Sequence, residues 1–306
     1  MKILVVALVL ALIVGVIGAW LVRQRAEAQA SLPPPVAPLP AGAVREALAP
    51  YQDALEATRR PVLRISLEDF PEDAPTASKV GGRAWWPEGE AAPVGEGGAA
   101  MVLLAQVNFA EVPATPGYPD TGLLQFFIVP NDFYGASMDR DYTVEALTQQ
   151  RNFRVVYWAD PSAPGQSLDI PSFEDEFYTP HKPQQPRRMR FAADTETLSA
   201  RDYRIDQMLG GNAWETLENW AKSKGYDDRS VVEVFEHLGG GGHKLGGYPD
   251  FTQQDPRKGG PLELLLQLDS DDRMMWGDVG VGGFYIDPAD LARKDFSRVM
   301  YNWDCH

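Results

Sequence analysis

Four short blocks of apolar and glycine residues occur twice in this chain, in the same order. The first set, between residues 81 and 159, reads GGRAWWP, LLAQV, GLLQFFI and FRVVYW; the second, between residues 244 and 304, reads GGYPDF, LLLQL, GGFYI and SRVMYNW. Blocks that are rich in β-branched and aromatic residues and bounded by glycine, proline or aspartate are typical of β-strands. We therefore predict an α+β fold of two similar antiparallel β units with helices, related by internal duplication.

Two helices are predicted between these units, at residues 213–224 and 230–238. The first has Asn212 as its N-cap, a stripe that includes Trp214 and Leu217, and Gly225 after its last turn. We expect the helical region 212–238 to join the two units. Further strands are predicted at VLRIS after Pro61 and at RRMRFAA.

The run LLLQL is almost continuously apolar and turns acidic after its last leucine. A strand that is apolar on both faces lies between two layers. We therefore predict that Leu264, Leu265, Leu266 and Leu268 are buried on both sides of a central strand.

Residues 3–22 are uncharged and almost wholly apolar, which is long enough for a helix to span a bilayer. We predict an uncleaved single-pass N-terminal membrane anchor, with the membrane as a partner. For the rest of the chain we favour the extracytoplasmic side of the membrane. A cleaved signal peptide is the alternative, because residues 28–30 imitate a cleavage site. The predicted domains are an anchor or signal peptide at 1–30, a proline-rich spacer at 31–42 and an α+β domain at 43–306.

The net charge of -15 disfavours electrostatic binding to nucleic acid, because an acidic body repels phosphate backbones. Basic partners or cations suit this charge better, and a protein partner is compatible with it. The single cysteine, Cys305, has no partner for an intramolecular disulfide.

Several longer motifs in fixed order carry a family resemblance: LLAQVNFAEVP, HKLGGYPDFTQQDP, LLLQLDSD, MMWGDVGVGGFYI and DFSRVMYNWDC, together with GGRAWWP and GLLQFFI. Over residues 81–305 the chain resembles the bacterial YwqG-like family of domains of unknown function. The resemblance implies an α+β fold of two similar halves. It implies no activity, cofactor or catalytic residue.

The densest acidic cluster is Asp269, Asp271 and Asp272, followed by Asp278. Hard cations bind several converging carboxylate oxygens, so these four residues are candidate metal ligands. The spacing does not fit an EF-hand, because Gly280 stands where that loop needs a glutamate. The alternative is an acidic turn, in which aspartates bond to nearby backbone amides.

Three other patterns have both a functional and a structural interpretation. Trp86 and Trp276 are candidate ligand-binding residues in a cleft between the halves, although large aromatic residues most often fill a core. The glycine run 239–242, followed by His243 and Lys244, resembles a phosphate loop, but Gly-Lys-Ser/Thr is missing at the required position and a helix precedes the run, which favours a connector. Cys305 with His243 or His306 could form a nucleophile–base pair, whereas a buried or terminal cysteine is the simpler interpretation.

No catalytic residue or cofactor can be assigned from the sequence, so enzyme activity is undecided. We predict a ligand- or protein-binding module, because no nucleophile, base and orienting residue occur together. The alternative is a metal-assisted enzyme that uses the acidic residues from Asp269 to Asp278.

Overall fold

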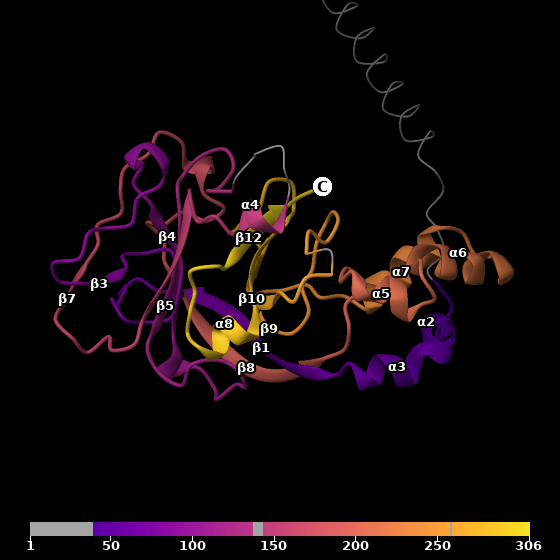
Figure 1. Ribbon diagram of the computed structural model, residues 1–306. Coiled ribbons are helices and arrows are strands. Elements are labelled where there is room, and N and C mark those ends of the chain that lie inside the picture. The colour runs from indigo at the N-terminus through magenta and orange to yellow at the C-terminus, as the bar shows by residue number, and fades with distance from the viewer. Residues whose placement is uncertain (1–38, 137–142, 258) are drawn as a thin grey trace, which may run out of the picture. The chain divides into compact units, whose positions relative to one another are not determined.

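The computed structural model describes residues 39–136, 143–257 and 259–306. The chain divides into two compact units, Met1–Ala41 and Gly42–His306, and every strand of the described chain belongs to the second (Figure 1). The strands are β1 (Arg60–Asp69), β2 (Lys79–Val80), β3 (Trp85–Pro87), β4 (Val102–Asn108), β5 (Leu123–Ile128), β6 (Phe153–Trp158), β7 (Gly165–Ser167), β8 (Arg187–Glu196), β9 (Lys244–Gly246), β10 (Glu263–Asp269), β11 (Val281–Ile286) and β12 (Met300–Asp304). The α-helices are α2 (Ala43–Leu48), α3 (Gln52–Ala57), α4 (Val144–Leu147), α5 (Arg204–Met208), α6 (Ala213–Ser223), α7 (Arg229–His237) and α8 (Pro288–Ala292), and 3-10 turns occur at Ala49–Tyr51, Glu96–Gly98, Phe109–Glu111 and Glu176–Tyr178.

Ten of the strands form one antiparallel sheet, in the order β12-β11-β10-β9-β1-β8-β2-β4-β5-β6. Its centre is the long pair β1 and β8, which stay in register from Arg60↔Glu196 to Asp69↔Arg187 and run together along the lower side of the sheet in Figure 1. β9 pairs with the free side of β1, and β2 pairs with the free side of β8. β3 and β7 form a separate two-stranded sheet.

The two sides of the sheet follow the same local order. The first arm consists of β2, β4, β5 and β6, the second arm consists of β9, β10, β11 and β12, and each strand pairs with the strand that follows it in the same arm. Each arm also has a shift in register at its second strand, between Leu103 and Ala105 in β4 and between Leu264 and Leu266 in β10. A shift of this kind inserts one extra residue and bends the strand.

The predicted α+β fold class, with two separate antiparallel units, is wrong. Sheet predominates, and both arms belong to one continuous sheet that is joined through β1 and β8, not through the helical region 212–238. The error has a physical cause. Apolar patterning marks where strands lie, but it does not show which distant strand supplies a strand's hydrogen-bond partners.

None of the helices in the described parts of the chain is long and apolar enough to cross a bilayer. The predicted anchor at residues 3–22 lies outside the described residues. We therefore correct four predictions: the transmembrane helix, the membrane as a partner, the membrane localisation and the extracytoplasmic side of the body. They depended on the hydropathy of residues 3–22 alone, and the structure gives them no support.

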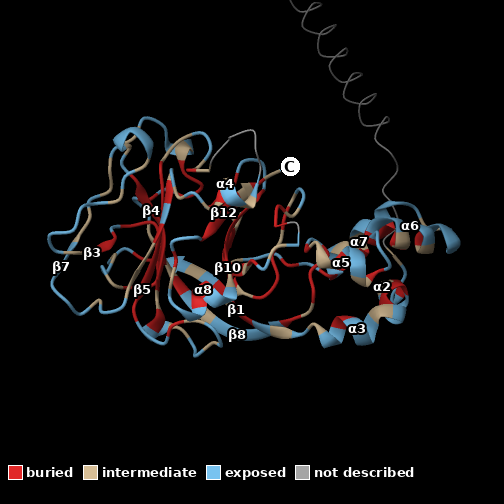
Figure 2. Ribbon diagram, in the orientation of Figure 1, coloured by how far each residue is buried: buried red, intermediate tan, exposed pale blue. Residues whose placement is uncertain are grey.

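The inner strands are buried on both faces, as the red colour along β4, β5 and β10 shows in Figure 2. The four leucines of β10 that were predicted to be buried each expose 3% or less of their surface, which confirms the prediction. Leu265 is the extra residue at the register shift of β10, and its carbonyl oxygen accepts a hydrogen bond of 2.7 Å from the hydroxyl of Tyr118. The shift therefore leaves no unpaired carbonyl at this point in the core.

Aromatic rings join the two arms into one core. Phe126 of β5 lies 4.6 Å from Phe284 of β11, measured between ring centroids, and Phe153 of β6 lies 5.2 Å from Tyr301 of β12. The two outermost strands, β6 and β12, therefore face each other across these side chains. Aromatic pairs at such distances stabilise a core beyond the area they bury.

The helices α6 and α7 confirm the two helices predicted from the sequence, with bounds that differ by a single residue. The side chain of Asn212 accepts a hydrogen bond of 3.0 Å from the backbone N–H of Glu215, as expected of an N-cap. The rings of Trp214 in α6 and Phe235 in α7 lie 5.6 Å apart. These helices lie together beside the second arm (Figure 1).

Candidate functional site

Two loops meet at the end of β10 that carries Asp269. One follows α7 and contains the glycine run 239–242, and the other follows β9 and contains Asp250. The fully buried side chain of Gln267 holds both of them. Its amide nitrogen donates to the carbonyl oxygens of Gly240 and Gly242 at 2.8 and 2.9 Å, and its amide oxygen accepts the N–H of Asp250 at 2.8 Å.

A pocket of about 350 Å³ lies between these loops and the helices α6 and α7. The size suits a small organic molecule or a single side chain. Its lining combines carboxylates, one arginine and apolar side chains, namely Arg201, Trp214, Val232, Phe235, Glu236, Gly239, Gly241, Asp250, Phe251, Thr252, Asp269, Val279, Val281 and His306.

Two carboxylates of this pocket lie close to Gly241. A Cβ atom at Gly241 would lie 3.4 Å from Oδ2 of Asp250 and 3.4 Å from Oδ2 of Asp269. Asp269 accepts the backbone N–H groups of Gly242 at 2.6 Å and Ser270 at 2.8 Å, whereas Asp250 accepts only the N–H of Phe251 through Oδ1 among the hydrogen bonds of the described residues. Burial, together with the charge of Asp269, raises the pKa of Asp250 above its ordinary value.

Part of the pocket lining is apolar and exposed. Trp214 exposes 45% of its surface, Val279 57% and Val232 40%. Only seven large hydrophobic residues are this exposed in the parts of the chain that the structure describes, and these three all line the same pocket. Exposed apolar surface that gathers around a cavity is typical of a binding site.

A buried ion pair lies next to the pocket. Lys244 of β9, which is opposite Gln267 in the sheet, has no exposed surface, and its ammonium lies 2.9 and 3.2 Å from the two oxygens of Glu196. Arg64 also contacts Glu196, at 2.7 Å. Burial disfavours the charged ammonium more than the ion pair favours it, and lowers the pKa of Lys244 to about 8.

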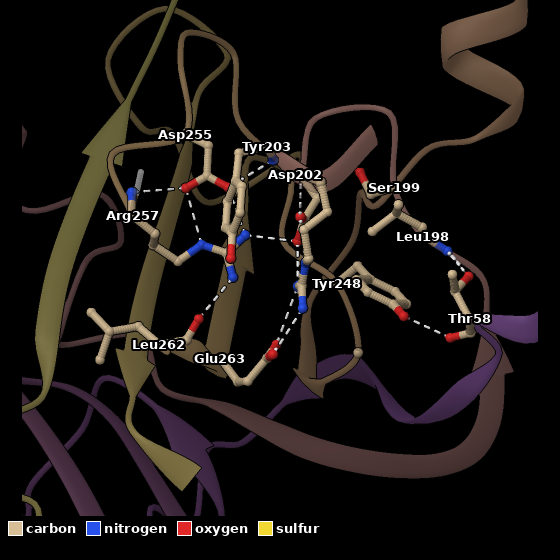
Figure 3. A network of polar contacts seen from close by, with 12 residues as sticks. Thr58, Leu198, Ser199, Asp202, Tyr203, Tyr248, Asp255, Arg257, Leu262 and Glu263 are labelled. Atoms are coloured by element: carbon tan, nitrogen blue, oxygen red, sulfur yellow. Dashed lines mark hydrogen bonds and ion pairs between the residues drawn. The ribbon is translucent and has the colours of Figure 1, made fainter. Parts of the chain in front are cut away.

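A second polar network, drawn in Figure 3, fixes the segment that leads to Arg201. The buried guanidinium of Arg257 contacts Asp202 at 2.7 Å and Asp255 at 2.6 Å, and Arg204 contacts Asp202 at 2.6 Å and Glu263 at 2.9 Å. Burial opposes ionisation of Asp202, but the two guanidinium groups outweigh it and lower the pKa of this carboxyl. Each of these charged side chains pairs with a side chain of opposite charge, so the network holds the structure together beside the pocket.

A family model described as a domain of unknown function, DUF1963, matches residues 78–305. The chain belongs to the DUF1963 family. The matched range includes every residue that lines the pocket except His306. No curated protein matches the chain.

The four aspartates predicted to bind a metal differ in their surroundings in this DUF1963 domain, although Arg187 contacts both Asp271 and Asp272. Asp269 lines the pocket. Asp271 pairs with Arg187 at 2.6 Å and accepts backbone N–H groups of the turn that follows it. The side chain of Asp272 is 82% exposed, and the carbonyl oxygen of Asp278 accepts the N–H of His306. Within the described ranges, no group of three or more His, Cys, Asp or Glu side chains is placed to hold a metal ion.

Asp271 lies in an acidic turn, which was the alternative to the predicted metal site. It also forms an ion pair that was not predicted. Burial opposes its ionisation, but the N–H of Arg273, the guanidinium of Arg187 and the ring of His243 outweigh it and lower its pKa to about 2. Nε2 of His243 lies 3.0 Å from Asp271, and Nδ1 accepts the N–H of Asp269 at 2.9 Å. Both ring nitrogens of His243 therefore have partners, and neither faces Cys305 as a base would.

Trp86 and Trp276 belong to separate core clusters. Trp86 packs against Phe127 and Trp158 in a cluster of the first arm, and its indole N–H donates to Glu90 at 3.2 Å. Trp276 is fully buried in the main core. The predicted ligand-binding role of these two residues stays a prediction, and neither lines the pocket at Gly241.

Sequence reasoning missed Asp250, Arg201 and the exposed face of Trp214 as parts of a site. Trp214 was assigned to the apolar stripe of its helix, where burial is the usual outcome. Asp250 lies within the motif HKLGGYPDF, but a single aspartate after a proline is usually interpreted as a turn residue. In the sequence around the site, only the four-residue glycine run indicated that another group lies close to the backbone.

We expect Asp250→Asn to raise the free energy of unfolding at neutral pH. Because burial raises the pKa of Asp250 in the folded chain, the folded chain keeps its proton to a higher pH than the unfolded chain does. Stability therefore falls as pH rises from the ordinary value of 3.8 through the raised pKa, and the asparagine variant should lack this part of the fall. Urea unfolding over a pH series measures the difference.

The matched control is Asp272→Asn, which removes the same charge from an exposed side chain. It should leave stability and its pH dependence nearly unchanged. A loss of stability in Asp250→Asn would contradict the prediction, because it would mean that the folded chain favours the ionised carboxylate.

Proposed function

We propose that this DUF1963 protein is a ligand-binding module of the YwqG-like type, and that the pocket at Gly241 is its binding site. One observation supports this function above the others. Three of the seven exposed large hydrophobic side chains of the described residues line a cavity that also contains two carboxylates close to Gly241. Concave, mostly apolar pockets with a few converging polar groups are the usual form of ligand sites.

A metal-assisted enzyme has weaker support. Of its four proposed ligands only Asp269 lines this pocket, and Asp271 already pairs with Arg187. A binding function needs neither a nucleophile nor a base, whereas hydrolysis would need both in reach of one another.

We expect Gly241→Leu to abolish binding at the pocket without unfolding the chain. Gly241 is exposed, and a Cβ atom there would meet its nearest neighbours at ordinary contact distance, so the backbone accepts a side chain. The leucine would then occupy the space between Asp250 and Asp269. Ligand-observed NMR with a library of small cationic, anionic and neutral compounds compares the variant with the wild type.

Ala91→Leu is the control, because it adds the same side chain at an exposed loop position outside this pocket. It should keep every compound that the wild type binds. If the wild type binds no compound, or if Gly241→Leu retains them all, the pocket is not a ligand site and the proposed function is wrong.

A further inference from the structure

The charges around the pocket discriminate between classes of ligand. Glu236, Asp250 and Asp269 contribute three carboxylates, and Arg201 contributes one guanidinium. An anion placed over Gly241 would meet two carboxylate oxygens at once, whereas a cation there would be attracted by both. The pocket therefore selects against anionic ligands.

The geometry at Gly241 fits a donor with more than one N–H group. Oδ2 of Asp250 and Oδ2 of Asp269 each lie 3.4 Å from the Cβ position of Gly241, so a group with several donors that packs against this glycine has both oxygens nearby. Ammonium and guanidinium groups carry several donors and form charge-assisted hydrogen bonds with carboxylates. Oδ2 of Asp250 has no hydrogen-bond partner among those found in the described residues, so it is available to such a donor.

The apolar side of the pocket indicates what the cation is attached to. Trp214 exposes nearly half of its surface and lines the pocket together with Val279 and Val232. An alkyl chain or a ring can pack on these side chains, and the face of an indole also attracts a cation. A bare inorganic ion would leave this apolar surface uncovered.

We propose that the pocket binds an organic cation, a primary ammonium or guanidinium group on an apolar chain. Asp250 and Asp269 accept its N–H groups, and Trp214 and Val279 pack on its apolar part. This inference rests on the proposed function, because it names the ligand class of the same pocket. Free amines and the side chains of lysine or arginine in a peptide share this chemistry.

The experiment compares three probes with the same six-carbon chain: hexylamine, hexanol and hexanoate. Binding to the full chain is measured by isothermal titration calorimetry at fixed ionic strength. We expect hexylamine to bind about tenfold or more tightly than the other two, since a hydrogen bond to a charged group is worth about that factor. Nα-acetyl-lysine methylamide, with its norleucine analogue as control, tests whether a peptide side chain is accepted as well as a free amine.

Two variants locate the binding. Asp250→Asn and Asp269→Asn should each weaken hexylamine binding by about tenfold, because each removes one charged acceptor. Asp272→Asn removes an equal charge from an exposed side chain outside the pocket and should change the affinity by less than about twofold. Folding of each variant is checked by urea unfolding.

The outcomes separate the inference from the proposed function. If hexanol or hexanoate binds as tightly as hexylamine, and Gly241→Leu abolishes that binding, the pocket is a ligand site but the cation assignment is wrong. If hexylamine binds the wild type, Asp250→Asn and Gly241→Leu equally, it binds the acidic surface and the inference fails. Absence of hexylamine binding also overturns the inference, while the compound library still tests the proposed function.

Discussion

Glu196→Ala is expected to lower the free energy of unfolding by about 3 to 5 kcal/mol, the usual cost of removing one partner of a buried ion pair. Lys244 has no exposed surface, and its ammonium bonds to both oxygens of Glu196 at 2.9 and 3.2 Å. Glu196 also accepts the N–H of Tyr248 and contacts Arg64. The alanine variant leaves the lysine charge in the interior without its counter-ion, and urea unfolding measures the loss.

Glu68→Ala is the matched control, because Glu68 pairs with Arg190 at the surface, where both side chains are more than half exposed. It should change stability little. The double variant Glu196→Leu with Lys244→Met should recover much of the lost stability, since an apolar pair of similar size needs no counter-ion. Equal losses for Glu196→Ala and Glu68→Ala would show that Lys244 reaches solvent or releases its proton at little cost.

Leu265→Ala is expected to lower the free energy of unfolding by about 2 to 5 kcal/mol, because it leaves a cavity in a fully packed region. Leu265 has no exposed surface and belongs to the core cluster that joins both arms. Its carbonyl is held by Tyr118, so the backbone of β10 has little freedom to collapse into the space. Urea unfolding with an unchanged slope would show that stability, and not the unfolded state, has changed.

Val94→Ala serves as the control, since Val94 is a branched apolar residue with 49% of its surface exposed. Its effect should stay within about 0.5 kcal/mol. A loss below about 1 kcal/mol for Leu265→Ala would mean that the surrounding side chains refill the cavity, contrary to the rigid packing inferred for β10.

The strands of both arms could be predicted because each is a short apolar run that ends at glycine, proline or aspartate. The blocks LLAQV and LLLQL became β4 and β10, and even the buried leucines on both faces of β10 followed from the apolar run. The central pair of β1 and β8 could not be predicted as a pair. More than a hundred residues separate the two strands in the chain, and the sequence of neither strand indicates that it pairs with the other.

The buried lysines show a second limit of sequence reasoning. Lys79 and Lys244 each stand two residues before a pair of glycines, and neither has exposed surface. A lysine beside glycines is normally expected at the surface, because burying its charge is costly without a partner. Their partners, Asp73 and Glu196, are supplied by separate loops and strands, so only the folded chain shows the pairing.

For the candidate site, the sequence selected one of the residues that line the pocket, and the metal-binding role predicted for the four aspartates stays a prediction. Asp269 was selected for its place in an acidic cluster, and it does line the pocket. Asp250, which lies close to Gly241 as Asp269 does, comes from a different loop and was not in that cluster. The closeness of the two side chains to Gly241 depends on Gln267, whose amide holds both loops from within the sheet.

The position of β1 between β8 and β9 also constrains the order in which the chain folds. Residues 60–69 leave the ribosome long before residues 187–196 and 244–246, with which they pair. Strands that pair within each arm are closer in the chain than β1 is to β8 or β9, and closing the centre requires contacts over a long sequence separation, which is slow. The sheet is therefore completed late in synthesis. Until then β1 has no partner strands, and other parts of the chain must prevent it from associating with other molecules.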